Sequence, residues 1–227
     1  MAAVRYDIIS IGTLSRNRLW NETQAVRTPH ATTTLIRTKS RHILVDPGLP
    51  TPAVAAHLFE RTGLRPEQID TVFLTNFRPA HRAGLGILSR ARILIHEFEQ
   101  QAAHQHLDSL LHQAPSEDID RKLIEQELRL LDRLQTAEDQ LEESVDLFPL
   151  FGYTPGSSGL LLSQPTATIL IAGDAVPTQE HFLAGQVLPD SYDIRAAQQS
   201  LQEVYEIADL IVPGHDNLFL NPRMHGI

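Results

Sequence analysis

Short apolar runs rich in β-branched residues alternate along the chain with segments whose apolar positions recur at a helical period. The runs predict strands at 7–12, 32–36, 42–46, 72–75, 92–95, 146–150, 159–162, 168–172 and 210–212. The helical segments are 54–59, 97–111, 118–145 and one that follows the N-cap residue Asp193 and ends near 208. Strands interleaved with helices predict sheet layers covered by helices, and the pattern leaves open a single doubly wound sheet or two stacked sheets.

The segment from Glu97 to Asp146 differs from the rest of the chain in its charge. It holds fourteen acidic residues against four basic ones, whereas the remainder is close to neutral. Between Leu123 and Val145, apolar residues recur among these charges and form a stripe on the predicted helix. We expect an ordinary packing face, with a cover over the site or a dimer contact as alternatives.

The bulk composition restricts the class of protein. A chain of 227 residues with 42% hydrophobic residues fits one domain with a sizeable core. A net charge of -9 argues against a nucleic-acid partner, because phosphate binding needs a basic surface. The absence of cysteine excludes disulfides and thiolate metal ligands. Without an apolar leader or a run of ~20 apolar residues, we expect a cytoplasmic protein with no membrane contact.

Four signatures at predicted strand ends resemble those of the metallo-β-lactamase superfamily. The first is Leu44–Gly48 (LVDPG) and the second is Thr75–Gly84 (TNFRPAHRAG), which resembles the ligand loop THxHxDHxxG. The third is Gly152–Gly159 (GYTPGSSG), and the fourth combines Ala172–Ala175 (AGDA) with Val212–Asp216 (VPGHD). Together they span nearly the whole chain in the family's order. The resemblance implies an α/β protein, an αββα four-layer sandwich formed by residues 1–227 as one domain, with a helical insertion at about 97–145.

Typical members of this family hold two metal ions at one edge of the sandwich. By resemblance, the first ion would be bound by Asn76, Arg78 and Ser157, with Asp174 bridging to the second. Asn is a weak neutral ligand, Arg is a permanent cation and Ser is a poor zinc ligand at neutral pH. We therefore expect the first metal position to be lost.

The second position keeps most of its ligands. Ala80 contributes no donor, but His81, Asp174 and His215 are residue types that bind divalent metals. We expect one ion there, with zinc ahead of iron or manganese, and a site without metal as the alternative. Each residue also has an ordinary role open to it, namely a backbone hydrogen bond for either histidine and a turn cap for Asp174.

Arg78 and Asn76 are the candidate catalytic residues besides the metal ligands. If the Arg78 guanidinium fills the vacated position, it could stabilise an oxyanion next to the ion. Alternatively it could pair with Asp174 and remove the only carboxylate ligand. Asp46 is expected to order the neighbouring loops, and His181 to lie at the surface, with a substrate contact as its alternative.

The family resemblance implies a hydrolase of esters, lactones, thioesters or amides that acts on a small molecule. The substitutions in the ligand loop keep a second class open, a non-catalytic binding or assembly protein that retains the scaffold. A homodimer through the insertion is a further open alternative.

Overall fold

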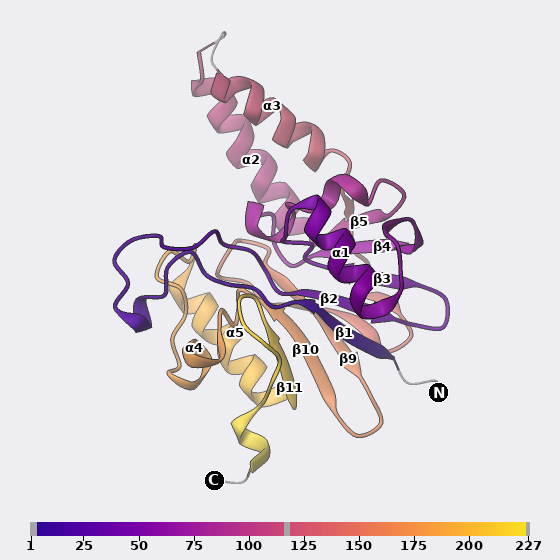
Figure 1. Cartoon of the computed structure of the whole chain (residues 1–227). Coiled ribbons are helices and arrows are strands. Elements are labelled where there is room, and N and C mark those ends of the chain that lie inside the picture. The colour runs from indigo at the N-terminus through magenta and orange to yellow at the C-terminus, as the bar shows by residue number, and fades with distance from the viewer. Residues whose placement is uncertain (1–3, 116–118, 226–227) are drawn as a thin grey trace.

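The computed structural model describes residues 4–115 and 119–225 and contains two six-stranded sheets packed face to face, with helices on both outer sides (Figure 1). This confirms the αββα sandwich and decides for two stacked sheets.

The first sheet has the strand order β1-β2-β3-β4-β5-β6. Its strands are Arg5–Ser10 (β1), Thr33–Arg37 (β2), His42–Val45 (β3), Thr71–Leu74 (β4), Arg92–Ile95 (β5) and Gln135–Thr136 (β6). β1, β2 and β3 pair antiparallel, whereas β3 to β6 run parallel. The carboxyl ends of β3 and β4 therefore lie side by side at one edge of this sheet.

The second sheet has the order β12-β11-β10-β9-β8-β7. Its strands are Gln140–Glu142 (β7), Val145–Pro149 (β8), Ser158–Ser163 (β9), Thr168–Gly173 (β10), Leu210–Pro213 (β11) and Phe219–Leu220 (β12). Only β10 and β11 pair in parallel, so their carboxyl ends also lie together. β4, β10 and β11, which precede the three predicted metal ligands, thus each end next to a parallel neighbour.

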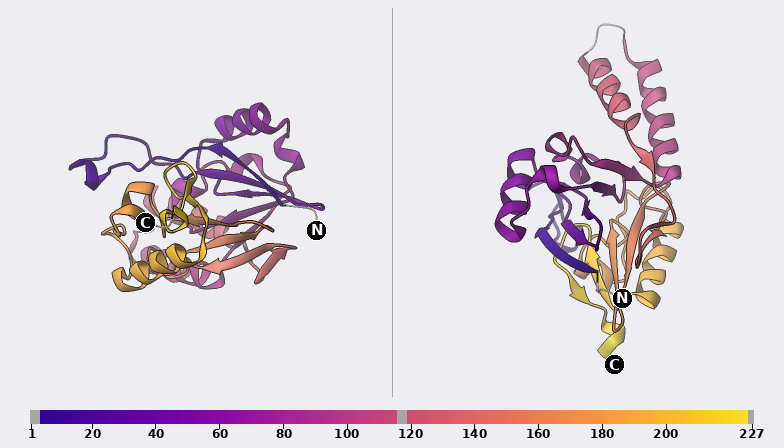
Figure 2. Two further views of the ribbon diagram at one scale, coloured as in Figure 1. Left: turned by 90° about the horizontal axis from the view of Figure 1, so that it is seen from below. Right: turned by 90° about the vertical axis from the view of Figure 1, so that its right-hand side faces the viewer.

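Five α-helices within the described parts of the chain flank the sheets. They are Thr51–Thr62 (α1), Glu97–Gln113 (α2), Ile119–Leu131 (α3), Gln179–Leu183 (α4) and Ile194–Ile207 (α5). Short 3₁₀ helices occupy Arg18–Trp20, Pro66–Gln68, Pro79–His81, Leu85–Ile87 and Pro222–His225. α2 and α3 form a hairpin that extends beyond the sandwich (Figures 1 and 2).

Alternating side chains of the buried strands serve two different cores. In β3, Ile43 and Val45 pack between the sheets, whereas Leu44 packs under the helices of the first sheet. In β4, Phe73 points between the sheets and Leu74 away from them. This follows from the two-residue period of a strand, and it explains why these strands read as continuous apolar runs.

The predicted helix over 118–145 is wrong in its second half, and residue 118 lies outside the described residues. α3 ends at Leu131, and the chain then contributes β6 to one sheet and β7 to the other. Leu134 and Val145 are buried, but in the sandwich rather than on a helix face, and Leu123 of the predicted stripe is exposed. Charged residues of good helix propensity occupy this stretch, and sheet pairing outweighs that weak preference.

Among the described residues, no helix is both long and apolar enough to cross a membrane.

The N-terminus of α2 is capped by a histidine. The His96 Nδ1 accepts a hydrogen bond from the backbone N–H of Phe98 at 3.1 Å, and the ring packs against Phe98 and Phe151. Burial lowers the pKa of His96 in spite of nearby carboxylates that act to raise it. The folded protein therefore favours the neutral, accepting form of this ring.

We predict that acid weakens this cap. Because the pKa of His96 is lower in the folded than in the unfolded chain, the folded state loses stability as pH falls through the unfolded value of ~6.5. Urea unfolding at pH 7.5 and 5 should show a steeper fall for the native protein than for H96N, which caps without titrating. Equal slopes for the two proteins would contradict the prediction.

Candidate metal centre

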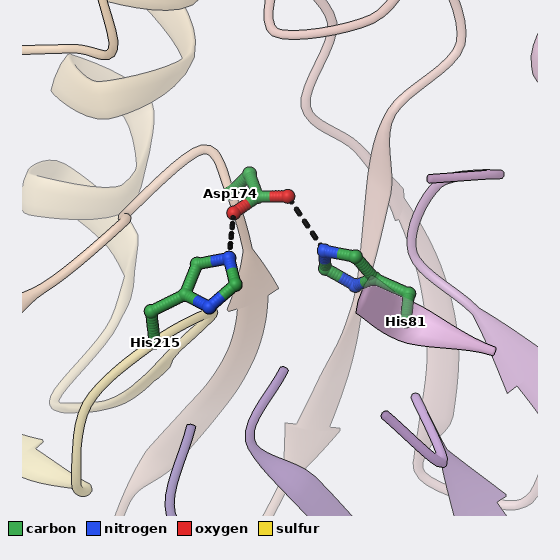
Figure 3. Close-up of side chains that lie close together, drawn as sticks. All are labelled: His81, Asp174 and His215. Carbon is green, nitrogen blue, oxygen red and sulfur yellow. Dashed lines mark ion pairs between the residues drawn. The ribbon is translucent and has the colours of Figure 1, made fainter. Parts of the chain in front are cut away.

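Loops from both sheets meet at one edge of the sandwich. His81 ends the 3₁₀ turn that follows β4, Asp174 follows β10 and His215 follows β11. The Asp174 carboxylate lies between the two imidazole rings, with one oxygen directed to each (Figure 3). The three residues predicted as metal ligands are thus brought together by the parallel pairs in the two sheets.

The geometry and burial of this triad fit a divalent ion. The His81 Nε2 lies 2.7 Å from Asp174 Oδ2, and the His215 Nε2 lies 2.9 Å from Oδ1. All three side chains are buried, and their donor atoms lie within 4.8 Å of one another. Oδ1 has no hydrogen-bond partner among the described residues, so its close contact with His215 is not aligned as a hydrogen bond. Two imidazoles and a carboxylate with an unsatisfied oxygen form a suitable donor set for zinc.

Each imidazole is oriented by a second partner on its other nitrogen. The His215 Nδ1 lies 3.0 Å from the carbonyl oxygen of His30 and therefore donates to it. The His81 Nδ1 lies 2.9 Å from Asp46 Oδ2 and 3.1 Å from Thr75 Oγ1. These contacts leave Nε2 of both rings facing Asp174, which is the arrangement that outer-shell partners impose on metal-binding histidines.

The two carboxylates beside His81 determine its charge without metal. Burial alone would lower the pKa of His81, but Asp46 and Asp174 outweigh this effect and raise it to about 10. Burial likewise opposes ionisation of Asp174, yet the adjacent His81 and His215 hold its pKa well below the ordinary value. Without metal, an imidazolium therefore stands between two carboxylates, and an ion binding at His81 has to displace its proton.

Asp46 orders the loops around the triad, as the sequence predicted. Its carboxylate accepts hydrogen bonds from the backbone N–H of Thr75 at 2.9 Å and from the Thr75 hydroxyl at 2.6 Å. Asp46 itself has a positive φ of 48°, an uncommon conformation for a residue other than glycine.

The loop that carries His215 needs a glycine at position 214, because a Cβ there would lie 2.9 Å from Asp174 Oδ1.

Asn76 holds Asp174 from the side of the predicted first metal position. Its amide nitrogen donates to Asp174 Oδ2 at 2.9 Å and lies 3.3 Å from His81 Nε2. Its oxygen accepts from the backbone N–H of Arg78 at 3.0 Å, which determines the orientation of the amide. Asn76 therefore presents N–H groups to the centre and lies beneath the pocket surface. A direct substrate contact for Asn76 stays a prediction.

Arg78 adopts neither of the two positions that the sequence left open. Its side chain is exposed, and the guanidinium lies 5.7 Å from the centroid of the Tyr153 ring. The described ion pairs of Asp174 are those with the two histidines. The hydroxyl of Ser157, the third residue of that position, donates to the carbonyl of Leu150 at 2.7 Å. Asn76 rather than Arg78 therefore neighbours the carboxylate.

A cavity of about 180 Å³ opens onto the triad. Sequence reasoning missed most of its lining, including Arg16, Arg18, Tyr153 and Asp190. His181 also lines it and is buried, so the expected surface position is wrong. Tyr153 lies in the predicted loop Gly152–Gly159. Its aromatic ring, within a loop at the site, was the sequence feature that could have marked it as a cavity residue. Burial and the charge of Asp174 raise the pKa of Tyr153, so its hydroxyl stays protonated.

A buried carboxylate from the helical hairpin joins two of the site loops. Glu99 of α2 is 4% exposed, and it accepts hydrogen bonds from the backbone N–H of Phe77 at 2.9 Å and of Gly156 at 3.1 Å. The backbone of α2 packs so closely here that a Cβ at Gly156 would lie 2.0 Å from Glu99 N. Glu99 thus connects the loops that carry Asn76 and Ser157.

Residues 27–215 match the model of the metallo-beta-lactamase superfamily. The chain belongs to this superfamily. No curated protein sequence matches the chain significantly.

Solved structures of the superfamily share the fold at low sequence identity. A Thermotoga maritima protein assigned as a metallo-beta-lactamase superposes with a TM-score of 0.70 and 17% identity, covering 96% of this chain and 99% of its own. AidC, a dizinc quorum-quenching lactonase, has a TM-score of 0.66 and 16% identity, covering 84% and 74%. Bacillus thuringiensis AiiA, with N-decanoyl-L-homoserine bound at its active site, has 0.62 and 19%, covering 94% and 92%. At such identity the likeness establishes the fold.

Loss of the Glu99 carboxylate should loosen the site loops. E99L leaves two buried backbone N–H groups without an acceptor, which should lower the free energy of unfolding by about 3 kcal/mol or more. E99Q retains one acceptor oxygen and should lose less. The exposed neighbour provides the control E97Q, and chemical denaturation measures all three variants. If E99L unfolds at the same denaturant concentration as E97Q, Glu99 does not hold the loops.

Proposed function

We propose that this protein is a hydrolase of the ester, lactone, thioester or amide class that works with one divalent ion. The observation that carries this proposal is the buried triad of His81, Asp174 and His215 at the base of a cavity. An ion bound by these side chains would supply Lewis acidity, polarising a carbonyl and acidifying water toward neutrality.

The proposal includes loss of the first metal position of the family's two-metal site. Three observations support it. Asn76 directs N–H groups rather than an oxygen toward Asp174, the Ser157 hydroxyl donates within its own loop, and Arg78 lies over Tyr153. An amide N–H group and a guanidinium offer a cation no lone pair, and the Ser157 hydroxyl is engaged within its own loop, which supports loss of this position.

Side chains and one backbone carbonyl of the protein orient the ligands and stabilise the developing charge. Asp46 and the His30 carbonyl hold the histidines in the orientation that leaves Nε2 available. Asn76 keeps Asp174 directed at them. The protonated Tyr153 hydroxyl lines the cavity and is our candidate donor to the oxyanion that forms when water attacks the substrate carbonyl.

The proposed setting is a cytoplasmic enzyme with a small-molecule substrate. A cavity of about 180 Å³ suits such a ligand, and the net charge of -9 disfavours nucleic acid. A homodimer through the α2–α3 hairpin remains a proposal.

Metal analysis tests the proposal most directly. After incubation with zinc and gel filtration, we expect close to one ion per chain, and little in H81A, D174N or H215A. H106A replaces an exposed histidine of α2 and serves as the control.

D46N should weaken zinc affinity by about 10–100-fold, because Asp46 orients the ligand His81. A80D adds a carboxylate where the family has one and should tighten binding.

Two results would overturn the proposal in different ways. Protein that takes up no zinc, iron or manganese would support the non-catalytic binding protein instead. Two ions per chain would show that the first position still binds.

Removal of the Tyr153 hydroxyl should slow catalysis with little effect on binding. Y153F keeps the ring beneath Arg78 but removes the proposed oxyanion donor, so kcat should fall about 10²-fold while KM changes less. The exposed Tyr192 allows the matched control Y192F. Equal kcat values for the two variants in the zinc-loaded form would exclude Tyr153 as the donor.

A further inference from the structure

Three arginines surround the cavity without carboxylate partners. Arg16, Arg18 and Arg78 line it, and all three side chains are exposed. Among the described residues, none of them forms an ion pair, whereas Arg27 and Arg82 each pair with a glutamate. Unpaired cations gathered at one cavity are notable in a chain of net charge -9.

Two of these arginines lie on an anchored segment. Between β1 and β2 the chain passes toward α4 (Figure 1). There the Asn17 amide donates to Glu180 at 3.2 Å, and the Trp20 indole donates to the same carboxylate at 2.6 Å. Arg16 also donates to the carbonyl of Thr23 at 3.3 Å. The hydrogen bonds of Arg16, Asn17 and Trp20 therefore hold this segment, and with it Arg16 and Arg18, at the cavity.

The third arginine approaches from the ligand loop. The backbone N–H of Arg78 is bonded to Asn76, and its guanidinium lies over Tyr153. Loops from different parts of the chain thus place positive charge around one opening. The acidic residues that line the cavity are Asp174 and Asp190. Asp174 is paired with the two histidines, whereas Asp190 is exposed. The rim consequently carries an excess of positive charge.

We propose that the substrate carries an anionic group, a carboxylate or a phosphoryl group, next to the bond that is hydrolysed. This inference rests on the proposed function. Guanidinium groups bind both kinds of oxyanion through paired N–H donors. In the reaction, water adds its oxygen to the acyl carbon, the bond to the leaving oxygen breaks, and that oxygen receives a proton. The anionic group takes no part in this exchange and serves to position the substrate.

Three esters with one leaving group test the inference on the zinc-loaded protein. They are 4-nitrophenyl butyrate, which is neutral, mono-4-nitrophenyl succinate, which carries a carboxylate, and 4-nitrophenyl 3-phosphonopropionate, which carries a phosphonate. We expect kcat/KM to be about tenfold or more higher for at least one anionic ester, as expected for a charge-assisted contact. The better of the two identifies the group, and the preference should shrink as salt screens the rim.

Substitution of the arginines should reduce the preference for the anionic ester. In R16Q, R18Q and R78Q the ratio of kcat/KM for the anionic and neutral esters should fall several-fold, and in the triple variant it should approach one. R90Q replaces an exposed arginine that does not line the cavity and should keep the native ratio. Equal rates for neutral and anionic esters, or a ratio that the triple variant retains, would overturn the inference and leave the proposed function standing.

A failure of the proposed function has a different signature. If no ester is hydrolysed, calorimetric titration with succinate and methylphosphonate decides whether the rim binds anions. Binding that the triple variant loses would support the anion site without hydrolysis, and no binding by the native protein would overturn it.

Discussion

The site depends on a buried carboxylate, that of Asp174. Burying the charge of Asp174 is unfavourable unless it is compensated, and the compensation comes from two loops that are distant in sequence. Asn76 donates to one oxygen, His81 lies beside the same oxygen, and His215 lies beside the other. The residue at 214 must be glycine for the last loop to approach. Removing any one partner would leave a buried charge incompletely compensated, so both sheets have to be correctly placed for the centre to exist.

The two sides of the Asp174 carboxylate differ in their chemistry. Where the triad keeps donor atoms for an ion, the adjoining region contains hydrogen-bond donors and a backbone-directed hydroxyl. In that region Glu99 of the α2–α3 hairpin bonds to backbone groups of both loops. Arg82 extends the connection, since it donates to the Phe77 carbonyl and pairs with Glu127 of α3. The hairpin thus supports the ligand loop by hydrogen bonds and an ion pair.

The surroundings of the cavity combine two kinds of chemistry. At its base lie the buried triad and the protonated Tyr153, which suit reaction at a carbonyl. Around its opening lie arginines from different loops, which suit recognition of a negative group. The superfamily scaffold supports varied substrates because such loops vary independently of the sandwich. AidC and AiiA share this sandwich, but likeness below 20% identity does not carry their ligands to this chain.

The sequence predicted the fold and the triad through motifs that resemble those of the superfamily, and such motifs can be read locally. Apolar runs marked the strands but left one sheet or two open, and the motifs placed His81, Asp174 and His215 after strand ends. The sequence did not predict that α3 ends at Leu131. The residues after it form β6 and β7, and these strands pair with strands that are distant in sequence. Nor could the sequence show that Asn76 rather than Arg78 would neighbour Asp174, since an Arg side chain can reach several positions and packing on Tyr153 selects one. The partners of Glu99 and the arginines around the cavity were likewise decided by the tertiary structure, because they join residues that only folding brings together.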